Sequence, residues 1–260
     1  MKYQLLVSTM NRNDISFLED MNVKSNTIVV NQSDHFDYEK VSGGSYDIEM
    51  YSFAERGVGL SRNTALMRAT ADIVEFADDD MVFVDNYEEI VVREFEMHPE
   101  ADAILFSIDS LNPDRPSHRI DRFKRVNRFQ GIKYGCARLA VRRSKLLYNN
   151  ISFSLLFGGG TKYSAGEDTI FISDMIKAGM KVCISPQKVA DVKQESSSWF
   201  NGFTDKFFKD KGSLIEAAFP SLSKILAVLL AVKNRRKYNT TFGHLYKLYT
   251  AGMKEYRMKK

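Results

Sequence analysis

Short apolar runs alternate with longer amphipathic stretches along the first 200 residues of the chain. The apolar runs are rich in β-branched and aromatic residues, which is typical of buried strands. This pattern predicts strands at residues 3–7, 27–30, 47–53, 73–76, 101–108, 135–141 and 181–184. It predicts helices at residues 14–21, 61–69, 86–97, 143–148 and 167–178. Strands that alternate with helices indicate an α/β fold with a mostly parallel sheet.

The pattern changes in the last quarter of the chain. Residues 222–232 are nearly all apolar apart from Lys224, and the basic run 233–237 follows them. An apolar helix with a basic end can contact an anionic membrane surface, or it can pack against the main domain. Residues 241–256 repeat the mixture of aromatic and basic side chains. We therefore expect an α/β domain at residues 1–200 and a helical, basic segment at 201–260 that is membrane- or acceptor-associated.

Three adjacent carboxylates, Asp78, Asp79 and Asp80, follow the predicted strand 73–76. A buried sheet tolerates such a cluster only at its edge, in water or beside a cation. Because side chains alternate along a strand, Asp78 and Asp80 can point to the same side. Two such carboxylates suit Mg²⁺ or Mn²⁺, with phosphate oxygens among the remaining ligands. A polar turn that simply closes the strand is the alternative interpretation.

Other polar segments converge on the same edge of the predicted sheet. The first strand runs into the polar loop 8–12, and the second ends at residues 31–34. Ligands of open α/β sheets bind outside the carboxyl ends of the strands. The arginine-rich segment 112–128 is predicted to be a mobile loop over this place. The sequence thus predicts a ligand site at the carboxyl edge of the sheet.

Composition limits the class of protein. A chain of 260 residues with 44% hydrophobic residues is long enough for one large domain, or for one domain with an appendage. The net charge of +4 is modest, and the basic residues gather after residue 224. This distribution suggests an anionic partner such as phospholipid or a polyphosphate, and we expect no nucleic-acid partner.

Cysteine use and hydropathy indicate the compartment. Cys136 and Cys183 lie far apart and lack the spacing of a metal site, so we expect buried thiols in a reducing cytoplasm. The apolar run near the N-terminus is too short for a signal peptide, and no run is long enough to span a membrane. We expect a cytoplasmic protein, with peripheral attachment to the inner face of the cell membrane as a candidate arrangement.

Three motifs together resemble those of the family 2 glycosyltransferases. They are the stretch Glu55-Arg-Gly-Val-Gly-Leu-Ser-Arg-Asn-Thr-Ala-Leu66, the acid triplet 78–80, and Gly166-Glu-Asp168. The resemblance covers roughly residues 3–200 and rests on the order and spacing of the motifs. It implies the GT-A fold, a Rossmann-like, mostly parallel sheet with helices on both faces. It also implies an inverting sugar transfer of the kind used in bacterial surface-polysaccharide assembly.

The resemblance assigns roles to particular residues. Nucleotide binding is implied for Ser8, Thr9, Asn11, Arg12, Asp34, Arg62, Asp78 and Asp79, and binding of Mn²⁺ or Mg²⁺ for Asp80 and Asp78. Asp168 matches the family's catalytic base, and Glu167, Gly159 and Trp199 are implied near the sugar or the acceptor. Each assignment has a plainer alternative. Glu167 and Asp168 also suit the first turn of a helix on electrostatic grounds, and Trp199 also suits a buried core.

The chain departs from the family pattern in two places. Its histidines, at positions 35, 98, 118 and 244, do not lie where many GT-A enzymes place a late metal ligand. The Gln-x-x-Arg-Trp motif of processive polymerases is also absent, so we expect addition of a single sugar. The function predicted is transfer from a nucleotide-sugar, expected to be a UDP-sugar, to a saccharide or a lipid-linked oligosaccharide.

Two other functions fit parts of the pattern. A nucleotidyltransferase would share the nucleotide pocket and the acidic metal site, although the N-terminal loop lacks the glycines and lysine that cradle a triphosphate. A non-catalytic module that binds nucleotide-sugar or glycan would keep the fold without the reaction. The intact acid triplet and Gly-Glu-Asp motif argue against that module.

Overall fold

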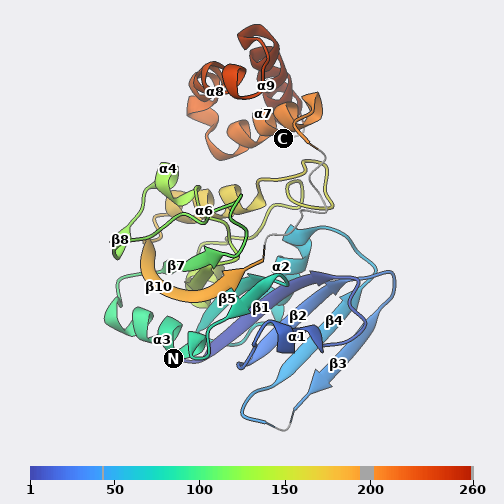
Figure 1. Ribbon diagram of the computed structural model, residues 1–260, viewed down its shortest axis with the longest axis vertical. Helices are drawn as coiled ribbons and strands as arrows, with labels where there is room; N and C mark the ends of the chain where they lie inside the picture. The colour runs from blue at the N-terminus through green and yellow to red at the C-terminus, as the bar shows by residue number, and fades with distance from the viewer. Residues whose placement is uncertain (43, 194–201, 259–260) are drawn as a thin grey trace.

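The strands form one mixed sheet in the computed structural model, which describes residues 1–42, 44–193 and 202–258 (Figure 1). The strand order is β3-β4-β2-β1-β5-β9-β7-β10-β6, and β8 pairs with β10. The strands are β1 (Tyr3–Met10), β2 (Thr27–Gln32), β3 (Asp37–Val41), β4 (Ile48–Phe53), β5 (Ile73–Asp78), β6 (Met81–Phe83), β7 (Ala103–Ser110), β8 (Lys124–Arg125), β9 (Leu139–Arg142) and β10 (Val182–Val192).

The helices alternate with these strands up to residue 177 and then follow one another. They are α1 (Phe17–Asp20), α2 (Val58–Arg68), α3 (Tyr87–Met97), α4 (Arg128–Gly131), α5 (Arg143–Tyr148), α6 (Glu167–Lys177), α7 (Asp205–Ala218), the 3₁₀ turn Pro220–Leu222, α8 (Ser223–Lys237) and α9 (Phe242–Arg257). The α/β fold predicted from the pattern is confirmed.

Strand direction explains where the carboxyl ends meet. The strands β4, β2, β1, β5, β7 and β10 all run the same way, because β9 is antiparallel to both of its neighbours, β5 and β7. An antiparallel strand begins at the edge where its neighbours end. The start of β9 therefore lies near the carboxyl end of β5, where Ala140 pairs with Glu75, and beside the middle of β7, where Leu139 pairs with Leu105.

Helices cover both faces of the sheet, as predicted. On one face Phe17 of α1 and Val91 of α3 pack against β1 and β7. On the other face Leu66 of α2, Leu146 of α5 and Phe171 of α6 share a second apolar cluster. Strands such as β2 are buried along their whole length, as expected for a sheet covered on two sides.

Several element boundaries differ from the predictions. Helix α2 begins at Val58 instead of residue 61, and Ser61 lies inside it, donating to Ser8 Oγ at 3.0 Å. Strand β10 continues past Pro186 to Val192. Its pairing with β7 shifts register between Ile184 and Lys188, so the proline, which has no N–H to donate, lies where the regular ladder is interrupted. Strand β3 was not predicted, because its largely exposed residues give no apolar signal.

The last three helices form a unit with its own small core. Phe208 of α7, Ala227 of α8 and Tyr249 of α9 belong to one apolar cluster, which is separate from the two beside the sheet. A further cluster joins α7 and α9 to Phe157 and Tyr163 of the main domain. The proposed boundary between residues 200 and 201 lies outside the described residues and stays a prediction.

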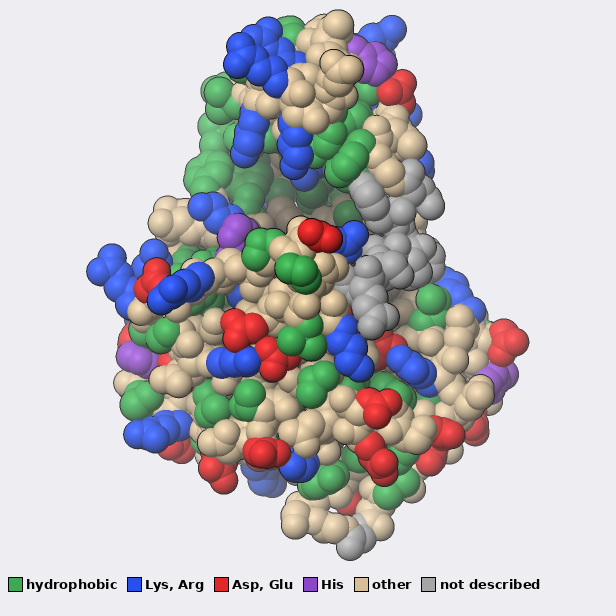
Figure 2. Space-filling model, viewed as in Figure 1, with side chains coloured by type: hydrophobic (Ala, Val, Ile, Leu, Met, Phe, Trp, Pro, Cys, Tyr) green, Lys and Arg blue, Asp and Glu red, His purple; other side chains and the backbone are tan. Residues whose placement is uncertain are grey.

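The outer surface of this helical unit is both apolar and basic. Figure 2 shows hydrophobic side chains gathered on one flank of the unit, with Lys and Arg side chains beside them. Within the described residues no single helix is long and apolar enough to span a membrane. The pair Asp205–Ala218 and Pro220–Lys237 meets the length and composition only when taken together across a bend of 118°.

Candidate active site

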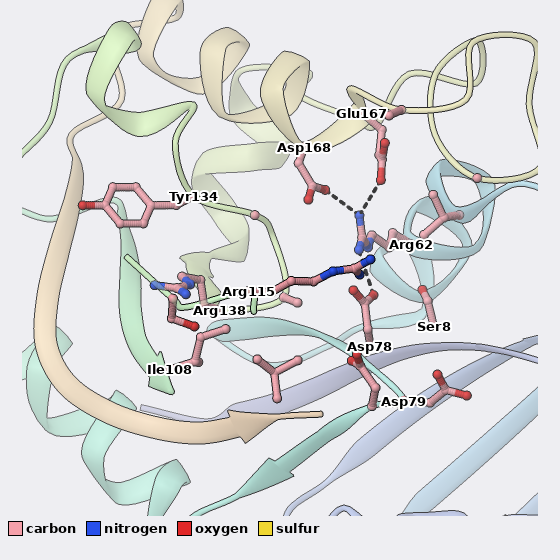
Figure 3. Close-up of a pocket in the computed structure, with 18 of the residues that line it drawn as sticks. Ser8, Arg62, Asp78, Asp79, Ile108, Arg115, Tyr134, Arg138, Glu167 and Asp168 are labelled. Atoms are coloured by element: carbon pink, nitrogen blue, oxygen red, sulfur yellow. Dashed lines mark hydrogen bonds and ion pairs between the residues drawn. The ribbon is translucent and has the colours of Figure 1, made fainter. Parts of the chain in front are cut away.

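A cavity of about 700 Å³ opens at the carboxyl edge of the sheet. It is lined by the ends of β1, β5, β7 and β10, by the first turns of α2 and α6, and by the segments 115–118 and 133–138. Figure 3 shows the side chains of Asp78, Arg62, Asp168 and Glu167 converging on one side, with Tyr134 and Arg138 on the other. The convergence predicted from the strand ends is therefore present.

The acid triplet contributes all three of its members to the lining of the cavity. Asp78 is the last residue of β5 and lies opposite Ser8 of β1 in the sheet. The neighbouring Asp79 turns to different partners, since its Oδ2 accepts hydrogen bonds from Thr9 Oγ1 at 2.6 Å and from Arg12 Nη2 at 2.9 Å. The triplet thus connects the ends of β1 and β5 at the floor of the site.

Arg62 of α2 joins three carboxylates from distant parts of the sequence. Its Nη2 lies 2.8 Å from Asp78 Oδ1, and its Nη1 lies 2.6 Å from Asp168 Oδ1 and 3.5 Å from Glu167 Oε1. The residue is only 2% exposed. A buried cation needs such partners to offset the loss of hydration, so the guanidinium and the carboxylates hold each other in place.

The Gly-Glu-Asp motif begins helix α6 at the roof of the cavity. Gly166 takes a left-handed conformation at the N-cap, and Glu167 and Asp168 occupy the first turn. Besides Arg62, the main-chain N–H of Cys136 donates to Asp168 Oδ2 at 3.0 Å. Burial, reinforced by the negative charge of Asp168, raises the pKa of Glu167 to about 7. The two adjacent carboxyl groups therefore differ in burial and in partners, as groups with different tasks often do.

The glycine loop 157–160 closes one wall of the site. The Gly159 carbonyl accepts a hydrogen bond from the N–H of Val58 at the start of α2, at 3.1 Å. Gly158 has φ of +110°, and a Cβ there would lie 2.7 Å from Val58 and 3.0 Å from the Glu167 carboxyl group. A side chain at this position would push α2 and α6 apart, so the loop needs glycine for close packing.

The structure brings together most of the residues singled out in the sequence. Ser8, Thr9, Arg62, Asp78, Asp79, Asp80, Gly159, Glu167 and Asp168 all line the cavity. Arg12 reaches it indirectly through Asp79.

Two predicted residues take other positions, and a third lies outside the described residues. Asn11 and Asp34 do not line the cavity within the described chain. Asn11 accepts a bond from Arg56, while the exposed Asp34 pairs with His35 at 2.8 Å. Trp199 falls in residues 194–201, which are outside the described residues. Nucleotide binding by Asn11 and Asp34 stays a prediction, and so does the acceptor role of Trp199.

Sequence reasoning anticipated only part of the cationic side of the cavity. Arg115, His118, Lys133 and Arg138 all line it. The placement of segment 112–128 over the site supplies Arg115 and His118, as expected. Lys133 and Arg138 had no such signal, because a lone basic residue before a short strand is common on protein surfaces. Only the antiparallel entry of β9 puts Arg138 at the carboxyl edge.

The carboxylates at the floor match what a hard divalent cation prefers. Asp78 and Asp80 both line the cavity, and the Asp78 side chain is 40% exposed despite its bond to Arg62. Within the described residues no group of three or more His, Cys, Asp or Glu side chains could hold a metal ion. Mg²⁺ commonly takes only one or two protein carboxylates and completes its shell with water and substrate phosphates, so the pair fits a cation that arrives with a nucleotide.

Of the comparisons with known proteins, only the one with solved structures finds matches. No protein-family model matches the sequence, and no curated protein matches it. Among solved structures, the 1–349 fragment of S. aureus TarS in complex with UDP-GlcNAc has a TM-score of 0.65 and 13% identity, over 100% of this chain and 93% of that chain. The same fragment in complex with UDP has a TM-score of 0.61 and 15% identity, over 100% of this chain and 92% of that chain.

A longer structure of the same protein also resembles the chain. S. aureus TarS has a TM-score of 0.62 and 16% identity, over 90% of this chain and 44% of that chain. At such identities the likeness establishes the fold and leaves the reaction to the geometry of the site. The GT-A-like fold expected from the motifs is confirmed.

Proposed function

We propose that the protein is a metal-dependent, inverting glycosyltransferase that moves one sugar from a UDP-sugar to a glycan or lipid-linked acceptor in polysaccharide biosynthesis. The observation that carries this proposal is the bridge made by Arg62. It joins a candidate base, Asp168, to the carboxylate of Asp78 at the end of β5. Structures that share this fold contain UDP-GlcNAc and UDP, which supports a nucleotide-sugar as the donor.

Asp168 has the geometry of a general base. Its two oxygens accept one hydrogen bond each, from Arg62 and from the Cys136 N–H. Carboxylate oxygens have two lone pairs each, so Asp168 can still accept the proton of an acceptor hydroxyl. Attack from the α6 side, opposite the departing diphosphate, would invert the anomeric carbon.

The floor of the cavity is the proposed place of the donor. Ser8 and Thr9 are buried at the end of β1, next to the acid triplet. Asp80 and Asp78 would hold Mn²⁺ or Mg²⁺, which when bound would offset the negative charge that develops on the leaving diphosphate. Arg115 extends over the same place, toward Asp78 and Arg62, and would add positive charge there (Figure 3).

Asp168→Asn tests the base assignment. Asparagine keeps the shape and can still accept from Cys136, but it cannot take a proton at neutral pH. We expect transfer to fall by roughly 10²–10⁴-fold, the usual contribution of a general base. The affinity for UDP, measured by calorimetry, should change little. Asp174→Asn, later on the same helix and outside the cavity, is the matched control.

Substitution of Asp80 tests the metal site. In Asp80→Asn, Mn²⁺ should no longer strengthen the binding of UDP, whereas in the native protein it should. If Mn²⁺ strengthens UDP binding equally in both proteins, the metal site is wrongly assigned. A full rate of transfer by Asp168→Asn would remove the proposed base.

Product analysis separates this proposal from the other functions. A nucleotidyltransferase would release pyrophosphate when given a nucleoside triphosphate and a sugar phosphate. The proposed enzyme would release UDP from a UDP-sugar instead. A binding module would bind UDP in calorimetry and release neither product.

We also propose that helix α8 contacts an anionic membrane, which would place the enzyme on the inner face of the cell membrane beside lipid-linked acceptors. The buried side of α8 consists of the small residues Ser223, Ala227 and Ala231. Its large apolar residues point outward, since Ile225 and Leu229 are 59% and 58% exposed. A helix that packs small residues inward and large apolar residues outward is suited to an apolar environment outside the protein.

Charge around this apolar stripe favours lipid over another protein surface. The helix carries no acidic residue, and Lys224, Lys233, Arg235, Arg236 and Lys237 flank or follow the stripe. Long basic side chains beside an apolar stripe reach the headgroups of anionic lipids while the stripe enters the bilayer surface.

Sedimentation with lipid vesicles tests this contact. The native protein should sediment with vesicles that contain phosphatidylglycerol, and less with pure phosphatidylcholine. The double variant Ile225→Asn/Leu229→Asn should lose sedimentation, whereas Met97→Gln, an exposed apolar residue at the end of α3, should keep it. If the double variant still sediments, or instead converts a dimer into a monomer in ultracentrifugation, the membrane assignment is wrong.

A further inference from the structure

Two buried arginines line the same cavity but have opposite environments. Arg62, 2% exposed, is bound to three carboxylates. Arg138, 6% exposed, makes no ion pair with any described residue, and its Nη1 has no hydrogen-bond partner. A buried guanidinium normally has its donors satisfied, because an unpaired buried charge is costly. Arg138 Nη1 is thus a buried donor that the described protein leaves unused.

The backbone fixes Arg138 at this position. It comes directly before β9, and its carbonyl accepts the Phe106 N–H of β7 at 2.9 Å. Its guanidinium carbon lies 5.6 Å from the centre of the Tyr134 ring. Burial lowers the pKa of Arg138 to about 10, which still leaves the guanidinium charged at neutral pH. The sheet therefore holds a charged, rigidly supported group at the wall of the cavity.

The charges near Arg138 also favour an anion. Lys133, next to Tyr134 in the chain, also lines the cavity. Asp109 at the end of β7 and Asp191 at the end of β10 share Lys188, at 3.0 and 2.7 Å, so these three charges sum to −1 against the two positive charges of Arg138 and Lys133. Net positive charge therefore remains on this wall.

Arg138 stands apart from the place proposed for the donor. Figure 3 shows it next to Ile108 and Tyr134, on the far side of the cavity from Ser8 and from the bond between Arg62 and Asp78. Asp168 has contacts toward both sides, since it binds Arg62 and accepts a hydrogen bond from Cys136, two residues before Arg138. A group bound by Arg138 would belong to the molecule whose hydroxyl reaches Asp168.

We propose that Arg138 binds an anionic group, a phosphate or carboxylate, on the acceptor. This inference rests on the proposed glycosyl transfer and names the chemical class of the acceptor. A guanidinium suits both groups because its paired N–H donors match two oxygens of the anion. The anion would supply the partner that the described protein does not, and it would orient the neighbouring hydroxyl toward Asp168.

Arg138→Met gives the central test, with Arg138→Lys as the variant that keeps the charge. The probe is glycerol 1-phosphate, with glycerol as its neutral match, titrated by calorimetry into protein saturated with UDP. We expect Arg138→Met to weaken binding of glycerol 1-phosphate at least tenfold and to leave the dissociation constant of UDP unchanged. Arg138→Lys should lose less affinity for glycerol 1-phosphate. Arg119→Met, an exposed arginine of segment 112–128, should match the native protein.

Thermal unfolding distinguishes a binding role from a structural one. Since Arg138 is a buried cation without an ion-pair partner among the described residues, an apolar side chain of similar size should leave the unfolding temperature unchanged or raise it. Glycerol 1-phosphate should raise the unfolding temperature of the native protein but not that of Arg138→Met. A lower unfolding temperature in Arg138→Met would assign Arg138 to structure and overturn the proposal.

Three further outcomes would decide between the sources of the anion. If Arg138→Met weakens the binding of UDP and of glycerol 1-phosphate equally, Arg138 binds the donor diphosphate. If the variant binds both as the native protein does, Arg138 has no ligand role. Either result overturns the acceptor site. Failure of UDP-sugar turnover with intact, Arg138-dependent binding of glycerol 1-phosphate would instead refute the proposed transfer and leave the anion site standing.

Discussion

Replacing Arg62 by methionine should destabilise the protein, although methionine fills a similar volume. The change removes the partner of Asp78, Glu167 and Asp168, whose contacts with Arg62 are 2.8, 3.5 and 2.6 Å. Loss of one partner in a buried ion-pair network costs about 3–5 kcal/mol. The carboxylates are partly exposed, with side-chain exposures of 40%, 14% and 27%, so water offsets part of this cost. We therefore expect about 3 kcal/mol, which lowers the unfolding temperature by roughly 6–12 °C.

A double-mutant cycle shows whether the carboxylates cause this loss. Adding Asp168→Asn to Arg62→Met removes one uncompensated charge, so the second substitution should recover roughly 1 kcal/mol or more. Both values come from thermal unfolding followed by circular dichroism. Arg68→Met, on the same helix but stacked over Tyr51, is the control and should cost less. An Arg62→Met variant within about 2 °C of native, or strictly additive effects, would refute the bridge as a stabilising network.

Two further predictions concern stability outside the site. Burial raises the pKa of Glu75 from 4.5 to about 7, so the native state holds this proton more tightly than the unfolded state. The free energy of unfolding should then fall by about 3 kcal/mol as the pH rises from 4.5 to 7. Urea titrations at pH 5.5 and 8 measure this dependence, and Glu75→Gln should remove it. If the pH dependence is unchanged in Glu75→Gln, other groups cause it. A Cβ at Gly212 would lie 2.1 Å from the Tyr249 carbonyl oxygen, so Gly212→Ala should cost about 1–3 kcal/mol and expose the C-terminal helices to protease. Gly243 has open space around it, so Gly243→Ala should hardly change the free energy of unfolding. Equal resistance of both variants to protease would contradict the close packing of α7 on α9.

The acid triplet and the Gly-Glu-Asp motif could be placed from sequence because each follows or begins a strongly patterned element. Strand β5 is buried up to Ala77, so the carboxylates had to mark its end. Their meeting with Arg62 could be anticipated only in outline, since Arg62 and Asp168 are 106 residues apart and their contact depends on how α2 and α6 pack.

The direction of β9 could not be predicted in the same way. The run 135–141 signals a strand by its apolar residues, but hydrophobic pattern does not tell a parallel strand from an antiparallel one. The direction depends on which edges of β5 and β7 remain unpaired. Arg138 was therefore missed, because its place in the cavity follows from that direction and not from its neighbours in the sequence.

The central position of β9 also affects the order in which a growing chain can complete its sheet. Strands β1 to β5 can pair with one another as soon as residue 78 has left the ribosome. The outer edge of β5 then stays open until β9, at residues 139–142, has been synthesised. Open, apolar strand edges readily pair with other chains, so the nascent protein is most prone to aggregation during this interval. In a series of C-terminal truncations, chains that end between residues 78 and 139 should therefore be the least soluble.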